Sequence, residues 1–397
     1  MIRDMRFVFS GFGIVIYTSL CAYIGARLFM FVRFFMPWTK AFIYWTVFIF
    51  LCYALVFVSF MRVPRLHFLE RVGSYWMAVF IYLLLLLPLF DLLRLGFFLF
   101  HRNALTPRFT AFGIGAALCL CFIIITYGAI HSGSIRTVQY AIRLSGQADG
   151  LRIALISDLH IGSGVGRKHI AKAVNVINRT EPDIVFIAGD IFDGNLGTVQ
   201  DMPGIAAEFR RIRPPLGVYA CLGNHDVDRM FPSGGGTERI VAFLKEAGIT
   251  LLQDEVAAIR ENMYIAGRRD ARPIGMNAQR KTAAELCSVI VDGIDPPDNE
   301  TRTLIVLDHQ PTQFAEIEAA GADLVLCGHT HRGQLFPVNL ITKSMYRKMG
   351  ASHYGYWRGN TLQAVITSGA GYWGPPLRVA TNSEVAVIDV TFGKDKP

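Results

Sequence analysis

Four long apolar stretches in the first third of the chain constrain the fold more than any other feature. They run over residues 7–26, 41–61, 75–93 and 109–130. About 20 apolar residues in a helix cross the hydrocarbon core of a bilayer, and a helix satisfies its backbone hydrogen bonds within one segment. The sequence therefore predicts an all-α transmembrane region of about four helices over residues 1–135, and a multi-pass protein of the cell membrane.

The basic residues around these stretches give a weak orientation signal. Short loops that stay in the cytoplasm usually carry the excess of Lys and Arg. Seven basic residues fall on one side and five on the other: Arg3, Arg6, Arg62, Arg65, Arg71, Arg136 and Arg143 against Arg27, Arg33, Lys40, Arg102 and Arg108. This count favours a cytoplasmic N-terminus and a cytoplasmic C-terminal domain.

One charged pair lies inside the third apolar stretch. Asp91 and Arg94 are three residues apart, a spacing that places both side chains on one face of a helix. We therefore expect them to pair with each other near the end of the span.

The net charge and the cysteines argue against three classes of protein. The formal charge of +8 would fit nucleic acid, but many basic residues flank apolar runs, and the C-terminal part has no basic stripe with interleaved aromatics. A membrane bilayer is the expected partner, nucleic acid is not, and the sequence names no protein partner. The seven cysteines include no CxxC pair, so neither a disulfide framework nor a zinc knuckle is indicated.

From Leu151 the pattern changes to short β-rich runs that alternate with amphipathic stretches such as residues 167–179. This alternation predicts a mixed α/β sandwich over residues 151–397, joined to the apolar region by a linker over residues 136–150. The expected strands cover residues 152–157, 183–188, 216–222, 263–266, 303–307, 323–327, 361–367 and 384–390.

Five blocks of polar residues each follow one of these expected strands. In chain order they are Asp158-Leu159-His160, Gly189-Asp190-Ile191-Phe192-Asp193, Gly223-Asn224-His225-Asp226, Asp308-His309-Gln310-Pro311 and Gly328-His329-Thr330-His331. Ligands of open α/β sheets bind in the crevice at the carboxyl ends of the strands. We therefore expect the blocks to meet in one crevice.

The residue types in these blocks indicate a metal centre. The candidate ligands are four histidines, two aspartates and one asparagine: Asp158, His160, Asp190, Asn224, His309, His329 and His331. Mixed nitrogen and oxygen ligands suit Mn, Fe or Zn, and seven ligands exceed the needs of one ion. Two ions about 3.5 to 4 Å apart would use them, provided that one carboxylate bridges both, and such a pair catalyses displacement at phosphorus. Asp190 is the expected bridge.

These blocks, with the tail Gly333-Gln334-Leu335-Phe336-Pro337, resemble the calcineurin-like metallophosphoesterases, particularly a membrane-associated bacterial branch related to UDP-diacylglucosamine hydrolases. The resemblance covers residues from about 150 to 390. It implies a four-layer αββα sandwich that holds two divalent metal ions. The implied ligands are Asp158, His160, Asp190 and His331 for the first metal, and Asp190, Asn224, His309 and His329 for the second.

The resemblance also implies two catalytic residues that bind no metal. His225 is expected to protonate the leaving oxygen or to steady the phosphate, because negative charge develops on the leaving oxygen during phosphoryl transfer. Asp193, by analogy with the family, is expected to orient His225 through a hydrogen bond.

Several departures and flanking residues bear on the substrate. Gly194 stands where the protein phosphatases of this family carry Arg, which disfavours a phosphoprotein substrate. Arg332 stands where close relatives often have Gly, and contact with phosphate or a solvated position are both open. Arg378, at the end of a closing segment that begins at Gly369, is a second candidate for substrate binding.

Two further features could shape the mouth of the crevice. The basic residues Arg268, Arg269, Arg272, Arg280 and Lys281 form either a phosphate-contacting loop or an ordinary solvated one. Tyr372 and Trp373 either face a base or an acyl chain, or belong to the core.

Two functions of different classes remain. The favoured one is a membrane-anchored metallophosphoesterase that hydrolyses a phosphodiester or pyrophosphate of a lipid-linked or nucleotide-linked metabolite. The alternative is a non-catalytic membrane receptor or scaffold whose phosphoesterase-like domain only binds. A degenerate domain usually loses ligands, whereas every expected ligand is present here, so the sequence favours the enzyme.

Overall fold

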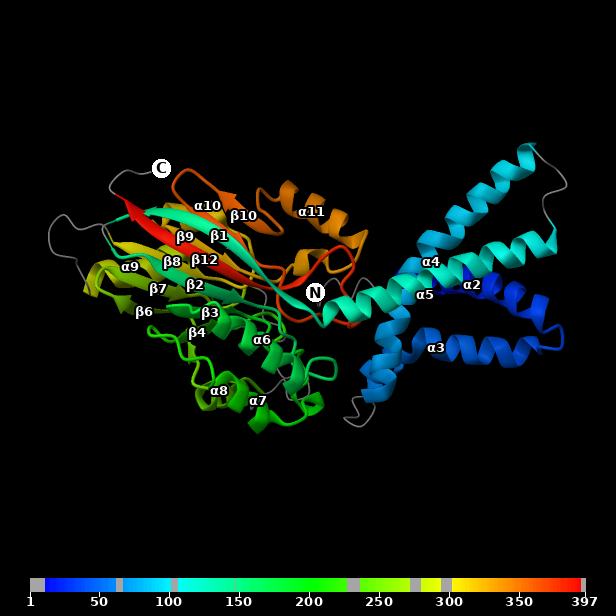
Figure 1. Ribbon diagram of the computed structural model, residues 1–397, viewed down its shortest axis with the longest axis horizontal. Coiled ribbons are helices and arrows are strands. Elements are labelled where there is room, and N and C mark those ends of the chain that lie inside the picture. The colour runs from blue at the N-terminus through cyan, green and yellow to red at the C-terminus, as the bar shows by residue number, and fades with distance from the viewer. Residues whose placement is uncertain are drawn as a thin grey trace. The chain divides into compact units, whose positions relative to one another are not determined.

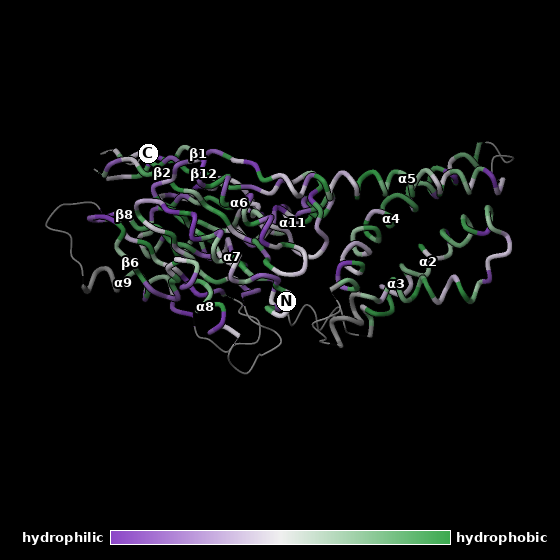
Figure 2. Tube along the Cα trace, turned by 60° about the horizontal axis from the view of Figure 1, so that its bottom comes forward, coloured by the Kyte–Doolittle hydropathy of each residue, from purple (hydrophilic) through white to green (hydrophobic). Residues whose placement is uncertain are grey.

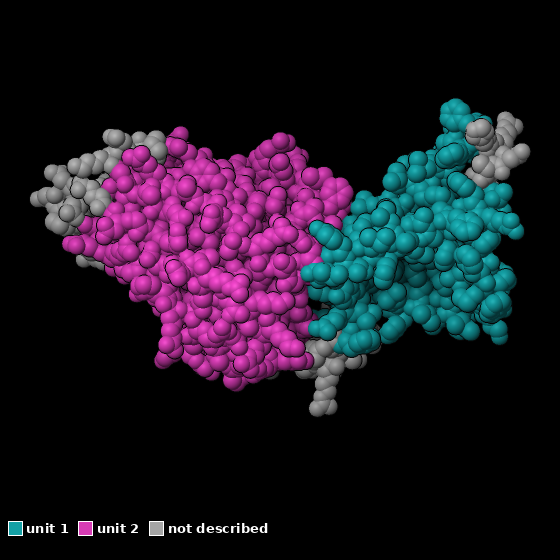
Figure 3. All heavy atoms as spheres, viewed as in Figure 1, with its two compact units in different colours: residues 1–130, 374–376 teal, residues 131–373, 377–397 magenta. Residues whose placement is uncertain are grey.

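The computed structural model describes residues 11–61, 67–100, 106–146, 148–226, 236–271, 280–293 and 302–393. The chain divides into two compact units (Figure 3). Unit 1 comprises residues 1–130 with 374–376, and unit 2 comprises residues 131–373 with 377–397. Each unit is described by itself.

The apolar region consists of long helices. They are α2 (Gly11–Phe35), α3 (Ala41–Met61), α4 (His67–Phe100) and α5 (Pro107–Ser132). Figure 2 shows them as predominantly apolar along their length. In the described residues, α2, α4 and α5 each contain a stretch long and apolar enough to cross a membrane, and α3 contains a shorter apolar stretch over Ala41–Ala54. This arrangement agrees with the expectation of about four helices, although residues 7–10 of the first predicted span lie outside the described residues.

The prediction of an ion pair within the third span is wrong. Asp91 on α4 instead pairs with a residue on α2, because Arg27 Nη2 lies 2.8 Å from Asp91 Oδ2. Tyr23 on α2 donates its hydroxyl to the same oxygen at 2.6 Å. No ion pair of the described residues joins Asp91 to Arg94. A carboxylate among apolar helices binds the cation that its neighbouring helix supplies, and residue spacing along one helix cannot reveal that neighbour.

Unit 2 contains two mixed sheets of six strands each. The first sheet has the order β1-β12-β2-β3-β4-β5, and the second has the order β10-β11-β9-β8-β7-β6. The strands of the first sheet are β1 (Ile135–Ser145), β2 (Leu151–Ile156), β3 (Ile184–Ala188), β4 (Val218–Cys221), β5 (Thr250–Leu251) and β12 (Ser383–Gly393). Those of the second are β6 (Glu255–Arg260), β7 (Met263–Gly267), β8 (Thr303–Leu307), β9 (Leu324–Cys327), β10 (Gly355–Arg358) and β11 (Gln363–Ile366).

Helices cover the outer faces of both sheets, so unit 2 has four layers (Figure 1). The helices are α6 (Arg167–Arg179), α7 (Met202–Phe209), α8 (Gly236–Glu246), α9 (Ala283–Gly293), α10 (Phe314–Ala319) and α11 (Val338–Lys348). One apolar core lies between the first sheet and α6, α7 and α8, a second lies between the two sheets, and a third lies between the second sheet and α9 and α10. The expected αββα sandwich is confirmed.

The expected linker over residues 136–150 is largely a strand. β1 pairs in parallel with β12 along its whole length, from Ile135 opposite Ser383 to Ser145 opposite Gly393. Only Ile142 and Leu144 of this edge strand are buried apolar residues. An edge strand tolerates polar side chains, so its sequence lacks the continuous apolar run that marks the buried parallel strands.

Candidate metal centre

The five polar blocks meet at the carboxyl ends of parallel strands. β2, β3 and β4 run parallel in the first sheet, and β8 and β9 run parallel in the second. The chain leaves each of these strands directly into one block. The residues that gather there are Asp158 and His160 after β2, Asp190 after β3, Asn224 and His225 after β4, His309 after β8, and His329 and His331 after β9.

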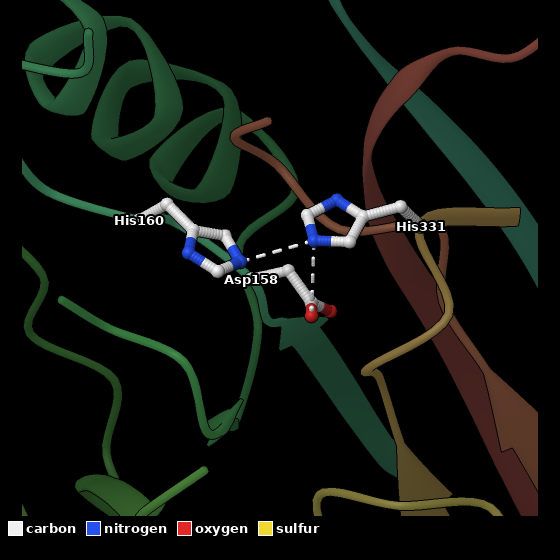
Figure 4. A group of neighbouring side chains, drawn as sticks. All are labelled: Asp158, His160 and His331. Carbon is white, nitrogen blue, oxygen red and sulfur yellow. Dashed lines mark hydrogen bonds and ion pairs between the residues drawn. The ribbon is translucent and has the colours of Figure 1, made fainter. Parts of the chain in front are cut away.

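A first cluster of candidate ligands consists of Asp158, His160 and His331 (Figure 4). The Nε2 atoms of His160 and His331 lie 3.0 Å apart. His331 Nε2 also lies 3.5 Å from Asp158 Oδ1. Two imidazoles and a carboxylate that present donor atoms to one point form a ligand set suited to a first-row divalent cation.

A second cluster surrounds His309. Its Nε2 atom lies 3.2 Å from Asp190 Oδ2, 3.2 Å from Asn224 Oδ1 and 3.1 Å from His329 Nδ1. On its other side, His309 Nδ1 lies 2.7 Å from the carbonyl oxygen of Ala188. A carbonyl only accepts, so Nδ1 carries a proton there, and the Nε2 lone pair is the one available to a metal.

Asp190 connects the two clusters. Its Oδ2 atom lies 3.2 Å from His309 Nε2 in the second cluster and 3.6 Å from His160 Nε2 in the first. Its Oδ1 atom accepts the backbone N–H of His225 at 2.7 Å. One carboxylate oxygen thus faces both clusters while the other is held by the backbone.

The backbone of these residues adopts an unusual conformation. The residues with left-handed φ angles are Asp158 (51°), His160 (48°), Asp190 (51°), His329 (71°) and His331 (49°). Gly189 shares this conformation, and a Cβ atom there would lie 2.7 Å from both Gly223 N and His309 Nδ1. Non-glycine residues in this region carry backbone strain that the surrounding fold must hold, and such strain concentrates at functional sites.

The charges in the centre favour an ionised carboxylate and one neutral histidine. Burial opposes ionisation of Asp190, but His309 and His225 hold its pKa well below the usual range. Burial likewise opposes protonation of His309, but the carboxylate of Asp190 raises its pKa well above the usual value. Burial, together with His160 and Arg378, holds the pKa of His331 well below the usual value. His331 is therefore neutral at neutral pH, whereas His309 carries a proton that a metal must displace.

We expect divalent metal uptake to release protons and to weaken as the pH falls. The pKa of His309 is raised, so its proton is bound at neutral pH and competes with the cation, and acidification strengthens that competition. Each displaced proton should weaken metal affinity about tenfold per pH unit below that pKa. Titration calorimetry in buffers with different ionisation enthalpies measures the release, and a binding heat that does not depend on the buffer would contradict it.

Asp193 has a different hydrogen-bond partner from the one expected. Its Oδ1 atom lies 3.1 Å from His160 Nδ1, within hydrogen-bonding distance, but 3.9 Å from His225 Nδ1, which is too far for a hydrogen bond. Asp193 therefore orients His160, whose Nε2 atom then faces the first cluster. His225 instead lies between aromatic rings, 5.0 Å from His160 and 6.0 Å from Trp373 between ring centroids.

Arg378 does not have the exposure that a substrate contact requires. Its side chain is fully buried. Arg378 Nη1 donates to the carbonyl oxygen of His331 at 3.1 Å, and Nη2 donates to those of Ser368 at 2.7 Å and Gly371 at 2.6 Å. The expectation of substrate binding is wrong for this residue, because its guanidinium holds the turn of His331 against the closing segment.

Replacing Arg378 with Gln should destabilise unit 2. The change leaves several buried carbonyls without a charged donor, at about 3 kcal/mol, which corresponds to a melting temperature lower by roughly 6–12 °C. Thermal unfolding of the purified chain measures the effect. The matched control is Arg152→Gln, whose half-exposed pair with Asp389 should contribute little. Equal melting temperatures for the two variants would contradict this role of Arg378.

The other residues expected at the mouth of the crevice differ in what they contact and in how exposed they are. The guanidinium carbon of Arg332 lies 4.2 Å from the ring centroid of Tyr354, in a cation–π contact. Tyr372 donates its hydroxyl to the carbonyl oxygen of Gly164 at 2.7 Å and is packed against the first core. Trp373 is 48% exposed beside His225. Of the two aromatic residues, Trp373 is the one available to a ligand.

The basic segment is in part a buried ion-pair network. Arg268 Nη1 lies 3.3 Å from Asp308 Oδ2, and Arg280 also bonds to this oxygen. Neither arginine is a solvated loop residue, and Arg272 lies outside the described residues. Asp308 had no predicted role, and its position directly before His309 was the only available signal.

Asp226 also had no predicted role, although it belongs to one of the quoted blocks. Its two carboxylate oxygens accept the backbone N–H groups of Phe192 and Gly223, each at 2.8 Å. The side chain thereby joins the loops that follow β3 and β4. It is a positioning residue for Asp190 and Asn224, which those loops carry.

Comparison with known proteins agrees with this geometry. Residues 151–333 match the family described as calcineurin-like phosphoesterase. A relative from Helicobacter pylori named "Uncharacterized metallophosphoesterase" is 30% identical over 239 residues, which cover 60% of this chain and 59% of that protein. A relative from Danio rerio named "Transmembrane protein with metallophosphoesterase domain" is 28% identical over 374 residues, which cover 87% of this chain and 80% of that protein.

The fold and the converging ligands define the C-terminal part of the chain as a metallophosphoesterase domain. Residues 151–333 are similar to the calcineurin-like phosphoesterases, a family whose members use divalent metals, and they follow a region of apolar helices in the chain. The chain spans 50% to 59% of the length of four of the curated relatives that it matches.

Proposed function

We propose that the protein is a membrane-anchored phosphoesterase that hydrolyses a phosphodiester or a pyrophosphate with two divalent metal ions. The position of Asp190 is the observation that carries this proposal. Its Oδ2 atom lies within 3.2 Å of a histidine of one cluster and 3.6 Å of a histidine of the other. A carboxylate shared in this way is what a pair of cations requires.

The proposed ligand division follows the two clusters. The mixed nitrogen and oxygen donors favour Mn, Fe or Zn. We assign Asp158, His160, Asp190 and His331 to the first ion, and Asp190, Asn224, His309 and His329 to the second.

The side chains around the clusters have distinct roles in the proposed reaction. The two ions, when bound, neutralise charge on the phosphoryl oxygens and lower the pKa of a water. His225 donates a proton to the leaving oxygen. Asp193 fixes the tautomer of His160 by accepting from Nδ1. Asp190 accepts the backbone N–H of His225 and so keeps that histidine beside the clusters.

We propose a lipid-linked or nucleotide-linked metabolite as the substrate, at the cell membrane and on its cytoplasmic side. The apolar helices support a membrane location, and the balance of basic residues supports the orientation. We further propose that the chain belongs to the branch related to UDP-diacylglucosamine hydrolases, which would favour this substrate class. Gly194, in place of an arginine, argues against a phosphoprotein.

A metal-dependence assay of the full chain tests the proposed function. The purified chain is stripped with a chelator, reloaded with Mn, and assayed with bis(p-nitrophenyl) phosphate. We expect hydrolysis to disappear on stripping and to return at two metal ions per chain. Metal binding without hydrolysis of any phosphoester would instead establish the receptor or scaffold alternative.

Two further measurements address the substrate and the orientation. Incubation of the metal-loaded chain with a membrane lipid extract should deplete one phospholipid or nucleotide-linked lipid. The C-terminus should resist external protease in intact cells, and its cleavage there would contradict the cytoplasmic assignment.

A further inference from the structure

Among the described residues of unit 2, exposed apolar side chains are concentrated in one place. Eight large apolar residues are exposed in its described part, and five of them lie on α11 or beside its ends. They are Phe336 (46% exposed), Leu340 (55%), Ile341 (66%), Met345 (51%) and Met349 (55%). α11 lies on the outside of the unit, where it is orange in Figure 1.

The apolar face of α11 points away from the core. Leu340, Ile341, Met345 and Met349 are separated by one, four and four residues, so they lie on the same side of the helix. Tyr346, on the other side, is the buried residue of this helix. A surface helix of a soluble domain normally turns its apolar face inward, and an exposed apolar face indicates a binding surface.

The charges around this face identify its partner. The sequence from Phe336 to Arg358 contains no Asp or Glu, whereas α11 carries Lys343, Arg347 and Lys348. None of the described ion pairs engages these three residues. An exposed apolar face with unpaired basic residues is the pattern of a helix that lies in the interface of an anionic bilayer. A second copy of the chain would present the same positive charge and be repelled.

The N-terminal end of α11 follows closely after the metal centre in the chain. The helix begins seven residues after His331, and Gly333 lies in the turn between them. A Cβ atom on Gly333 would lie 2.3 Å from Asn339 Cα, so this turn packs directly against the first turn of α11. The backbone N–H of Asn339 donates to the carbonyl oxygen of Leu335 at 3.0 Å. The turn that follows His331, a candidate ligand of the first cluster, therefore packs against the N-terminal end of the exposed helix.

We propose that α11 is an interfacial helix through which the phosphoesterase domain itself binds an anionic bilayer. The apolar helices of unit 1 attach the chain to the membrane, and α11 is a second, independent contact. The substrate class that follows is an amphiphilic phosphoester presented at the bilayer surface. Only this last statement rests on the proposed function.

Spin labels on the full chain in lipid nanodiscs test the contact. Cys119 is the exposed cysteine and the other six are buried, so Cys119→Ser provides the background. The label is placed by Ile341→Cys on α11, with Val241→Cys, an exposed aliphatic position on α8, as the matched control. We expect the label at 341 to be accessible to oxygen and shielded from an aqueous nickel chelate, more strongly with phosphatidylglycerol than with phosphatidylcholine. The label at 241 should remain accessible to nickel in both lipids.

Each alternative outcome overturns the proposal. Equal nickel accessibility at positions 341 and 241 would mean that α11 faces water. Shielding of position 341 from both oxygen and nickel would mean that a protein, such as a second copy, covers the helix. Charge reversal of Lys343, Arg347 and Lys348 should abolish the preference for phosphatidylglycerol, and a preference that persists would exclude the electrostatic contribution.

Activity measurements separate the contact from the chemistry. The double variant Ile341→Asp and Met345→Asp should hydrolyse a water-soluble diester within about twofold of the wild-type rate, but a lipid phosphoester in nanodiscs at least about tenfold more slowly. Val241→Asp should change neither rate. An equal loss on both substrates would overturn the assignment of an amphiphilic substrate. If the wild-type chain hydrolyses nothing, the proposed function fails while the spin-label result still stands.

Discussion

Asp190→Asn should lower turnover at least about 100-fold and leave the chain with fewer than two bound metal ions. Loss of a hydrogen-bond partner behind a metal ligand typically costs about 10–100-fold in metal affinity or activity. Asp190 is itself the side chain that faces both clusters, so the upper end of that range is the minimum expected here. We attribute the expected loss of turnover and of metal to one atom, Asp190 Oδ2, which faces both clusters.

The geometry explains why the amide cannot substitute. The Oδ1 atom of Asp190 accepts the backbone N–H of His225, and only the oxygen of an asparagine can do so. The amide NH₂ group would then point toward His309 Nε2 and His160 Nε2, and it has no lone pair with which to bind a metal. The fold should therefore persist while the proposed bridge between the two ions is lost.

Elemental analysis and steady-state kinetics on the same preparation measure this effect. Asp389→Asn is the matched control, because Asp389 is half-exposed and pairs with Arg152 at the start of β2, the end opposite to the one that leads to Asp158. Its turnover and metal content should stay within about twofold of the wild type, as for an exposed ion pair. Two tightly bound ions with wild-type turnover in Asp190→Asn would exclude Asp190 as the bridge between them.

His225→Gln should lower turnover about 100-fold to 1,000-fold on an alkyl phosphodiester while the metal content stays unchanged. The proposed ligand division does not include the side chain of His225, and its backbone N–H, which holds Asp190, is retained in the variant. The histidine lies beside His160 and the exposed Trp373, where a leaving group can reach it. The expected defect is one of proton donation.

The leaving group distinguishes proton donation from a structural role. An activated aryl leaving group departs with little help from an acid, so the loss on an aryl diester should be less than about tenfold. A structural defect would reduce both rates equally. His169→Gln serves as the control, because His169 is a half-buried histidine of the same domain that bonds to the carbonyl oxygen of Ala370. It should not change the ratio of the two rates.

Much of this arrangement could be predicted from local sequence. The strands before the five blocks are buried parallel strands, and such strands appear as continuous apolar runs. The expected strand over residues 303–307 and the expected helix over 167–179 coincide with β8 and α6. Parallel strands direct the residues that follow them to one edge, so the convergence of the blocks could be predicted as well.

Contacts between distant segments could not be predicted in this way. Asp193 was expected to bond to His225 and lies closer to His160, and Asp91 was expected to bond to Arg94 and binds Arg27. Arg378 was expected to bind substrate and is fully buried. In each case the sequence identified a polar residue that takes part in a specific interaction, but it did not predict the partner of that residue. Side-chain packing decides which residues pair.

The sequence by itself determined which side chains are the candidate ligands and which strands they follow, because hydrophobic periodicity and strand ends are local properties of the chain. The tertiary structure decided which donor atoms face one another, that Asp190 faces both clusters, and that the apolar side of α11 is turned outward. These properties depend on distances between atoms that are far apart in sequence, and packing of the two sheets and their helices sets those distances.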